Sequence, residues 1–428
     1  MSNVLMISAI VMLVLLFLKV PVYIAVLGGS MVYFVMNPGT NSVVFAQQAI
    51  IGTEKISLMA IPFFICAGIF MNYTGVTKRI MDFCEVVTGR LPGGLAQVNV
   101  LLSTVMGGLS GSNIADAAME SKMMVPEMTN KGFSLEFSSV VTAASSMIPP
   151  LIPPGIAMIL YGCIANVSIG KLFISGFGVG GLLCITMMIL VGVISKKRGY
   201  GILSTEKLTW TRFWTALKPA ILPLLLPIII IGGIRIGIFT ATEAGAVAIL
   251  YAAFLGILYH EMHVKDMIQG LKETVASTAS IMLIVSAASV FSWILTKERI
   301  PQTLTAWMLA NIHSKYVFLI VVNIFLLIVG MFIEGNASMI ILVPLLAPIA
   351  AKYGINEIQF AMIYIFNNAI GALSPPMGTL MFVTCSITKC KTAAFIKEAV
   401  PFYILLVVNL LLLTWFEPFT TFLVNLFY

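Results

Sequence analysis

Long runs without a single charged residue recur along this chain, for example over residues 221–234 and 317–333. Of the 428 residues, 60% are hydrophobic and only 10% are charged, whereas soluble domains carry about 25% charged residues. A water-soluble fold cannot bury this much apolar surface, so the surrounding medium has to be mainly lipid. The sequence therefore predicts an all-α polytopic membrane protein in the lipid bilayer, and it excludes a soluble enzyme or a disordered scaffold.

The net charge of +7 comes largely from basic residues in the segments between apolar runs. Cytoplasmic loops of membrane proteins are enriched in Lys and Arg, so this charge predicts membrane topology and not a nucleic-acid partner. Residues 196–218 hold six basic residues and one acidic residue, which predicts that a linker over 201–216 is cytoplasmic. The six cysteines lie in or beside apolar segments without a metal-ligand spacing, so we expect neither a transition metal nor an organic cofactor.

Ten apolar segments are predicted to be membrane spans. Between them, residues 91–131 and 301–352 each contain two short apolar helices around a break rich in glycine, serine or asparagine. Non-helical backbone at membrane depth is tolerated only where protein or a watery cavity surrounds it, so we expect two re-entrant helical hairpins. The expected spans are 3–18, 22–36, 46–72, 134–163, 169–195, 217–236, 240–259, 274–296, 358–387 and 400–427.

Similar motifs recur in both halves of the chain at a nearly constant offset. The pair Pro153-Pro154 recurs as Pro375-Pro376, and Asp116 in the first hairpin matches Glu334 in the second. An ordered series of such matches indicates an internal duplication. We expect a first repeat over 1–200 with its broken helix at about 134–163, the linker over 201–216, and a second repeat over 217–428 with its broken helix at about 358–387.

The number of crossings sets the orientation of the two repeats. Each repeat has five full crossings if its hairpin returns to the side from which it enters, and an odd number inverts the second repeat relative to the first. Two inverted repeats are typical of secondary transporters. With the linker in the cytoplasm, both termini lie in the periplasm, and Lys55, Lys171 and Arg235 lie on that side.

Polar residues cluster at the two hairpin breaks and at the two proline-broken helices. Proline and glycine free backbone carbonyls there, and carbonyls with hydroxyls are hard oxygen ligands for a small cation such as Na⁺. We expect at least two Na⁺ sites, one between residues 110–113 and the break around 145–150, and its repeat mate between residues 335–338 and 374–379. The alternative is that the prolines only kink their helices and the serines bond back to the backbone. The candidate Na⁺ ligands are Ser103, Ser110, Gly111, Ser112, Asn113, Ser145, Pro149, Pro150, Gly335, Asn336, Ala337, Ser338, Ser374, Pro375, Gly378 and Thr379.

A substrate carboxylate is expected between the cation sites, because half-helix N-termini that face each other favour an anion. The matching acids Asp116 and Glu334 either lower the local potential for a cation or only cap their hairpin helices. The candidate substrate-binding residues are Ser110, Ser112, Asp116, Pro154, Gly155, Glu334 and Pro376.

Other classes of function are weaker alternatives. An ion or solute channel also uses carbonyls and broken helices, and a cation-coupled organic-anion transporter can work without a binding protein. A membrane enzyme is disfavoured, since no metal set, nucleophile–base pair or phosphate loop is present. Residues 176–181 match the dinucleotide pattern GxGxxG, but small residues at this spacing in a membrane helix indicate close helix packing.

Ordered motifs along essentially the whole chain resemble the large membrane subunit of TRAP (tripartite ATP-independent periplasmic) transporters, the DctM-like family. The resemblance is carried by Ile61-Pro62-Phe63-Phe64-Ile65-Cys66-Ala67-Gly68, Gly89-Arg90-Leu91-Pro92-Gly93-Gly94-Leu95-Ala96, Ser110-Gly111-Ser112 with Ala115-Asp116-Ala117, Gly237-Ile238-Phe239-Thr240 with Thr242-Glu243-Ala244, and Pro375-Pro376 with Gly378. One departure is Gly155, where the family often has serine after the paired prolines.

This resemblance implies the partners, the driving ion and the mechanism. A family member is not an enzyme; it works in the bacterial inner membrane with a small four-span membrane subunit and a periplasmic substrate-binding protein. A Na⁺ gradient drives the import of an organic-acid substrate, such as a sialic acid or a C4-dicarboxylate. The region that bears the hairpins is expected to move as an elevator against a scaffold, and the overall likeness favours the sialic-acid branch.

Overall fold

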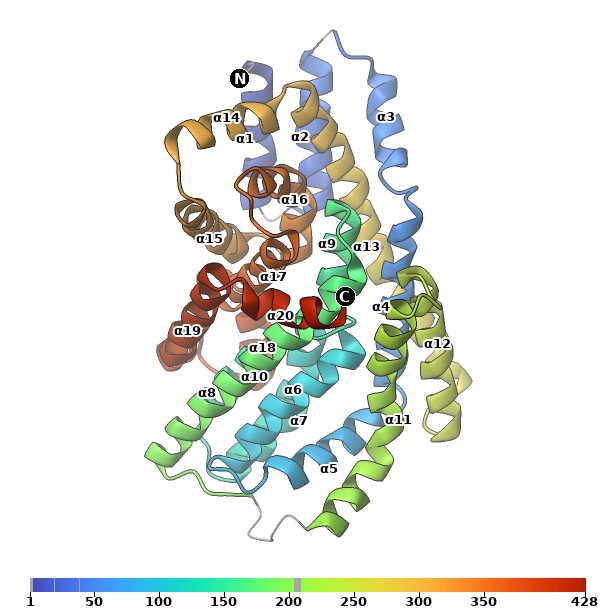
Figure 1. Ribbon diagram of the computed structural model, residues 1–428, viewed down its shortest axis with the longest axis vertical. Helices are drawn as coiled ribbons and strands as arrows, with labels where there is room; N and C mark the ends of the chain where they lie inside the picture. The colour runs from blue at the N-terminus through green and yellow to red at the C-terminus, as the bar shows by residue number, and fades with distance from the viewer. Residues whose placement is uncertain (1–2, 19, 38, 204–208) are drawn as a thin grey trace.

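The computed structural model describes residues 3–18, 20–37, 39–203 and 209–428. All regular secondary structure within these residues is helical, as a chain that must satisfy its backbone hydrogen bonds inside lipid requires. The N-terminus lies at the top of Figure 1 and the C-terminus near its middle, in front of the helices that form the centre of the molecule. Lys19, between the expected spans 3–18 and 22–36, and residues 204–208 of the predicted linker lie outside the described residues.

The first half of the chain contains ten α-helices and two short 3₁₀ helices among its described residues. These are α1 (Asn3–Phe17), α2 (Val22–Met36), α3 (Ser42–Ile51), a 3₁₀ turn (Ile56–Met59), α4 (Ala60–Asn72), α5 (Val76–Thr88), α6 (Gly94–Ser110), α7 (Asn113–Asn130), α8 (Leu135–Ser145), a 3₁₀ turn (Pro149–Leu151), α9 (Ile156–Ala165) and α10 (Ile169–Arg198).

The second half follows a similar order. Its helices are α11 (Trp210–Arg235), α12 (Ala241–Leu258), α13 (Val264–Lys297), α14 (Ile300–Asn311), α15 (Lys315–Phe332), α16 (Gly335–Lys352), α17 (Glu357–Leu373), α18 (Thr379–Thr388), α19 (Thr392–Trp415) and α20 (Pro418–Phe427). Helix α6 begins at Gly94 and α15 at Lys315, while α7 begins at Asn113 and α16 at Gly335. Corresponding hairpin helices therefore start 221 and 222 positions apart and have similar lengths.

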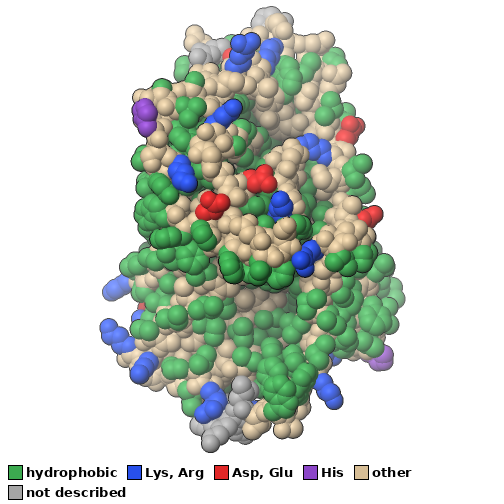
Figure 2. All heavy atoms as spheres, in the orientation of Figure 1, with side chains coloured by type: hydrophobic (Ala, Val, Ile, Leu, Met, Phe, Trp, Pro, Cys, Tyr) green, Lys and Arg blue, Asp and Glu red, His purple; other side chains and the backbone are tan. Residues whose placement is uncertain are grey.

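Seven described helices are long and apolar enough to cross a membrane, and the number rises to nine if each of two bent pairs counts as one span. The bent pairs are α3 with α4, at 54°, and α8 with α9, at 42°. Helices α1 and α2 are apolar but only 15 residues long each. Figure 2 shows hydrophobic side chains over much of the visible face, with Lys and Arg gathered along its lower margin and near its top.

Several predicted boundaries were wrong where polar residues or prolines divide an apolar stretch. The expected span 46–72 is broken at Gly52, because a polar turn separates α3 from α4. The expected span 400–427 comprises the end of α19 and all of α20, since Pro418 has no N–H to continue the earlier helix. The helix that contains the expected span 274–296 begins ten residues earlier, at Val264. Its first turns are polar, so a search for apolar residues does not include them.

The predicted hairpin over 301–352 and the predicted linker over 201–216 also differ from the structure. The stretch 301–352 contains three helices, because Ser314 caps a new helix and separates α14 from the pair α15 and α16. Helix α14 thus occupies the position that α5 holds before α6. The linker is shorter than predicted, since the Thr209 hydroxyl accepts from the Arg212 N–H and α11 begins at Trp210.

Close helix crossings depend on glycine at one pair of facing positions. A Cβ added to Gly371 of α17 would lie 2.6 Å from the Gly330 Cα of α15. Small residues let membrane helices approach to backbone contact, which stabilises them where no hydrophobic effect acts between helices. The same two helices are joined by a buried hydrogen bond of 2.8 Å from the Asn367 amide to Asn323.

Candidate functional site

The tip of the first hairpin is a two-residue break between α6 and α7. Helix α6 ends at Ser110, and Gly111 adopts a left-handed conformation with φ of 59°. The Ser112 hydroxyl then caps α7 by accepting from the Ala115 N–H at 3.4 Å. The Ser110 hydroxyl donates to the Asp116 carboxylate at 2.7 Å, and both residues are buried. The C-terminal carbonyl groups of α6 and the N-terminal N–H groups of α7 therefore lie side by side at this tip.

The first broken helix lies against this tip. Helix α8 ends at Ser145, and α9 restarts at Ile156 after the proline-rich break. A Cβ added to Gly111 would lie 2.7 Å from the Pro154 carbonyl oxygen, so only glycine lets the two backbones come this close. This contact brings the carbonyl-rich break beside the hairpin tip, as the sequence predicts for the first half.

The tip of the second hairpin is built around Glu334. Its carboxylate accepts a hydrogen bond from the Ala337 N–H at 3.0 Å and so caps α16, which is one of the two roles considered for this acid. Asn368 of α17 donates its amide to the Gly335 carbonyl at 3.0 Å and accepts from the Ser338 hydroxyl at 3.0 Å. The second tip is thus held by an amide side chain from the broken helix.

Both tips and both broken helices meet at one cavity of about 70 Å³. Its lining includes the first residues of four helices: Asn113 of α7, Ile156 of α9, Gly335 of α16 and Thr379 of α18. Each helix N-terminus presents the positive end of its dipole, which stabilises an anion by about 0.3–1 kcal/mol. At α7 and α16 one N–H group is already capped, by Ser112 and by Glu334. Four N-termini around one cavity favour a carboxylate. The sequence-predicted residues that line it are Gly111, Ser112, Asn113, Pro150, Glu334, Gly335, Asn336 and Thr379.

A second cavity of about 200 Å³ shares Ser112, Ile156 and Asn336 with the first. It extends from the tips toward α4 and α13, and it adds Asn72 and Ser277 as polar lining residues. Ser110 lines this cavity as well. The two cavities together form a space between the hairpin tips and the helices beside them, with polar side chains at several points of a partly apolar lining.

The remaining candidate residues do not line either cavity. The Ser103 hydroxyl lies within hydrogen-bond distance of two acceptors, the Asn99 carbonyl at 3.1 Å and Glu120 at 2.6 Å, and its single proton is shared between them. The Ser374 hydroxyl donates to the Ile370 carbonyl at 2.8 Å. Some of the serines that the sequence suggested as ion ligands therefore form hydrogen bonds to carbonyls of their own helices. Residues outside both linings are Ser103, Ser145, Pro149, Ala337, Ser338, Ser374, Pro375, Gly378, Asp116, Pro154, Gly155 and Pro376.

Sequence reasoning missed four polar residues near the site. Asn72 is the one polar residue of the apolar helix α4, and that isolation is a signal that marks it. Asn368 follows Asn367, and Ser277 lies in a stretch of α13 that holds several other hydroxyls, so neither stands out in the sequence. Glu120 is fully buried one turn after Asp116, and its Oε1 atom has no hydrogen-bond partner among the described residues. An acid inside a predicted membrane hairpin is itself a signal for function.

The arrangement separates two kinds of binding chemistry. Helix N-termini offer N–H groups to an anion, while helix C-termini and proline breaks offer carbonyl oxygens to a hard cation. Among the described residues, no group of three or more His, Cys, Asp or Glu side chains is placed to hold a metal ion. The oxygen atoms at the two tips belong to backbone carbonyls, hydroxyls and side-chain amides.

Comparison with known proteins assigns these features to a family. The family described as "Tripartite ATP-independent periplasmic transporter, DctM component" matches residues 9–419. The chain is 37% identical over 414 residues to the sialic acid TRAP transporter large permease protein SiaM of Vibrio cholerae, covering 96% of each chain. It is 34% identical over 364 residues to the C4-dicarboxylate TRAP transporter large permease protein DctM of Pseudomonas aeruginosa, covering 85% of each.

A solved structure has a similar fold. The YdaH transporter of Alcanivorax borkumensis superposes with a TM-score of 0.61 at 13% sequence identity, covering 96% of this chain and 98% of that one. At this identity the likeness concerns the fold alone. The sequence relatives are permease components of transporters and not enzymes, in agreement with the prediction.

Proposed function

The chain belongs to the DctM component family of the tripartite ATP-independent periplasmic transporters, and on this premise we propose that it imports an organic acid by Na⁺-coupled secondary transport. It is a multi-pass membrane protein of a bacterial TRAP transporter, and we assign it to the inner membrane with both termini periplasmic. The observation that carries the substrate class is the convergence of four helix N-termini on the cavity between the hairpin tips.

The coupling ions are proposed to bind beside this cavity. One Na⁺ would lie between the first tip, at 110–113, and the break around 145–150, and a second between residues 335–338 and 374–379. The close approach of Gly111 to the Pro154 carbonyl supports the first site, because it brings an oxygen ligand to the tip. The Gly335 carbonyl and Asn368 supply oxygen atoms at the second. Substrate between two cations would have its charge balanced on both sides.

We further propose that the two halves are inverted repeats and that the hairpin-bearing part moves as an elevator. The parallel order and spacing of helices α6 to α10 and α15 to α19 support this assignment. Helices α5 and α14, each placed just before a hairpin, would act as arms between the moving part and a scaffold. Alternating access requires such connections to bend while the packed bodies stay rigid.

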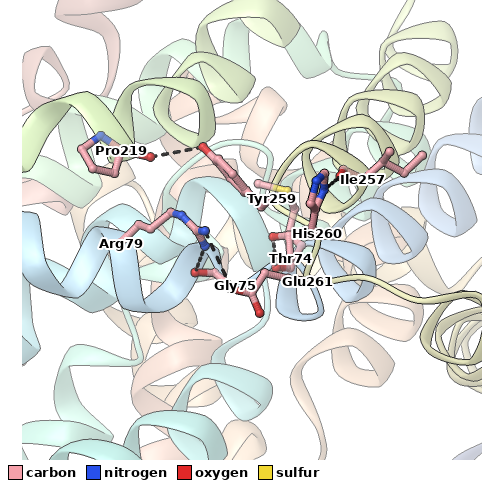
Figure 3. A network of polar contacts seen from close by, with 9 residues as sticks. Thr74, Gly75, Arg79, Pro219, Ile257, Tyr259, His260 and Glu261 are labelled. Atoms are coloured by element: carbon pink, nitrogen blue, oxygen red, sulfur yellow. Dashed lines mark hydrogen bonds and ion pairs between the residues drawn. The ribbon is translucent and has the colours of Figure 1, made fainter.

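A cluster of polar contacts joins the first arm to neighbouring helices (Figure 3). Arg79 of α5 donates to the Gly75 carbonyl at 2.8 Å and lies 3.9 Å from the centre of the Tyr259 ring. Glu261 lies 3.8 Å from the same guanidinium, and the Tyr259 hydroxyl donates to the Pro219 carbonyl at 3.2 Å. These contacts tie α5 to α11 and to the end of α12, where an arm would have to be anchored.

The proposed partners follow from the tripartite family. A small membrane subunit would stabilise the scaffold, and a periplasmic binding protein would deliver substrate. Relatives named for sialic acid and for C4-dicarboxylates make these two acids the first substrates to test. The alternatives are a channel, or a cation-coupled transporter that works without a binding protein.

Proteoliposomes test this proposal directly. The protein is reconstituted with its cognate small subunit, and uptake of radiolabelled N-acetylneuraminic acid or succinate is followed with and without an inward Na⁺ gradient and the binding protein. We expect accumulation above the external concentration only when Na⁺ and the loaded binding protein are both present. Equilibration without accumulation would indicate a channel, and robust uptake by the lone chain at micromolar substrate would contradict the tripartite assignment.

A further inference from the structure

A separate cavity of about 400 Å³ lies away from the hairpin tips, between α3, α9, α13 and α16. It is open to the surface, and it shares no lining residue with the two cavities at the tips. Its volume lies within the range of about 300–1,000 Å³ that is usual for small-molecule sites. The cavity is thus large enough for a small organic acid.

The charge at this cavity comes from one side chain. Lys55, in the turn after α3, is the only charged residue among the described residues that line it. Its ammonium forms no hydrogen bond or ion pair with the described part of the chain, although Glu54 is its neighbour in sequence. An exposed cation without an internal partner is available to an anion that enters the cavity.

Hydroxyl groups follow one face of α13 along the same wall. Ser289, Ser292 and Thr296 are spaced three and four residues apart, and all three line the cavity. The Thr296 hydroxyl donates to the Ser292 carbonyl at 2.8 Å, whereas the hydroxyls of Ser289 and Ser292 have no partner among the described residues. This wall therefore presents hydrogen-bonding groups that are not used within the fold.

An aromatic side chain completes the wall. Trp293 is partly buried and stacks on Phe34, with ring centres 5.5 Å apart. Stacking on Phe34 restrains the indole, so this part of the wall is held in one orientation. The neighbouring cavity of about 380 Å³ around Val343, Ala347 and Phe360 differs in charge, because its one charged residue among the described lining residues is the acid Glu357.

We propose that the Lys55 cavity is a vestibule that binds a hydroxylated organic carboxylate before it reaches the hairpin tips. Lys55 pairs with the carboxylate, and Ser289 and Ser292 bond to substrate hydroxyls. This inference rests on the proposed function in one respect, that the transported solute is an organic acid. The vestibule would concentrate substrate beside the moving part of the protein and raise its rate of capture.

Site-directed thiol labelling tests the anion preference without requiring transport. Ser289→Cys is prepared in the full chain, and modification of that peptide by an anionic or a cationic methanethiosulfonate reagent is followed by mass spectrometry. We expect Lys55→Gln to slow the anionic reagent about three- to tenfold while the cationic reagent is not slowed. Lys55→Arg should retain the anionic rate, and Lys171→Gln, which removes a cation away from the cavity, should leave both rates unchanged. Equal rate ratios in all variants would overturn the proposal.

Uptake kinetics provide the second measurement. With N-acetylneuraminic acid as probe, Lys55→Gln should raise KM several-fold and leave kcat within about twofold, because the change acts on capture and not on movement. Excess N-acetylneuraminic acid should also slow labelling of Ser289→Cys. If the unaltered protein shows no Na⁺-dependent uptake but the labelling pattern holds, the proposed function fails and the anion site stands. If uptake is normal and Lys55→Gln changes neither readout, the vestibule is refuted.

Discussion

The side-chain amide of Asn368 donates a hydrogen bond of 3.0 Å to the backbone carbonyl of Gly335. This contact joins the second broken helix to the first turn of α16, directly at the cavity between the hairpin tips. The hydrogen bond restrains the orientation of the Gly335 carbonyl, and a group that binds an ion or a substrate has to be held in a defined orientation. The bond therefore links the geometry of the site to one amide side chain.

Replacing that amide should impair transport more than folding. In Asn368→Ala, the Gly335 carbonyl and the Ser338 hydroxyl each lose a partner, so we expect uptake to fall about tenfold. Asn311→Ala is the matched control, since that exposed amide bonds only within its own helix. Comparable expression with reduced Na⁺-dependent uptake supports a role at the site, whereas wild-type uptake contradicts it.

The serines of the first tip should set the Na⁺ requirement. Ser110→Ala and Ser112→Ala remove hydroxyls that line the cavity beside the tip, so we expect a several-fold rise in the Na⁺ concentration for half-maximal uptake. Ser386→Ala, an exposed serine that bonds within its own turn, is the control. The first Na⁺ site is misplaced if both tip variants keep the wild-type Na⁺ dependence.

A glycine pair should govern stability. Gly371→Ala places a Cβ 2.6 Å from the Gly330 Cα, so we expect the protein to be less stable by about 1–3 kcal/mol. Gly232→Ala is the control, because its added Cβ meets no atom within 4 Å and alanine favours a helix. Thermal unfolding in detergent should separate the two variants. Equal melting temperatures would argue against a close crossing of α15 and α17.

The contact of Arg79 with Tyr259 should affect the rate of transport. Arg79→Gln removes the cation above the ring and the pairing with Glu261, which loosens the proposed anchor of the α5 arm. We expect maximal uptake to fall about three- to tenfold with KM little changed. The neighbouring exposed Lys78→Gln serves as the control. A change in KM alone would place Arg79 in substrate handling instead.

Labelling of single cysteines should establish the position of the termini. Arg235 donates to the Phe427 carbonyl at 2.9 Å, and Lys171 lies 5.9 Å from the Tyr428 ring. Both cations are expected on the periplasmic side, so a cysteine after Tyr428 and Asn3→Cys should react with an impermeant maleimide on whole cells. Gly201→Cys, in the predicted cytoplasmic linker, should react only after lysis. A reversed pattern would mean that a crossing has been miscounted.

Apolar length and the breaks within it predicted much of the helical architecture, because a bilayer demands long apolar helices wherever the chain crosses it. Glycine, serine and proline at 110–113 and 149–155 interrupt such apolar helices, and this interruption predicted the first tip and the first break. The short helices α14 and α20 escaped prediction, since nearly all of α14 and all of α20 lie in stretches that were taken as single units. Asn368 was missed because its partners, Gly335 and Ser338, are set by tertiary packing and not by local sequence.

The four helix starts around the cavity of about 70 Å³ offer their N–H groups from the main chain. Main-chain groups are the same for every amino acid, so substitutions around them can change the shape of the space without removing its attraction for a carboxylate. Relatives named for different acids are compatible with such a division of labour. Under the proposed function, a few neighbouring side chains would select the cargo, and the main-chain N–H groups would bind its carboxylate whatever those side chains are.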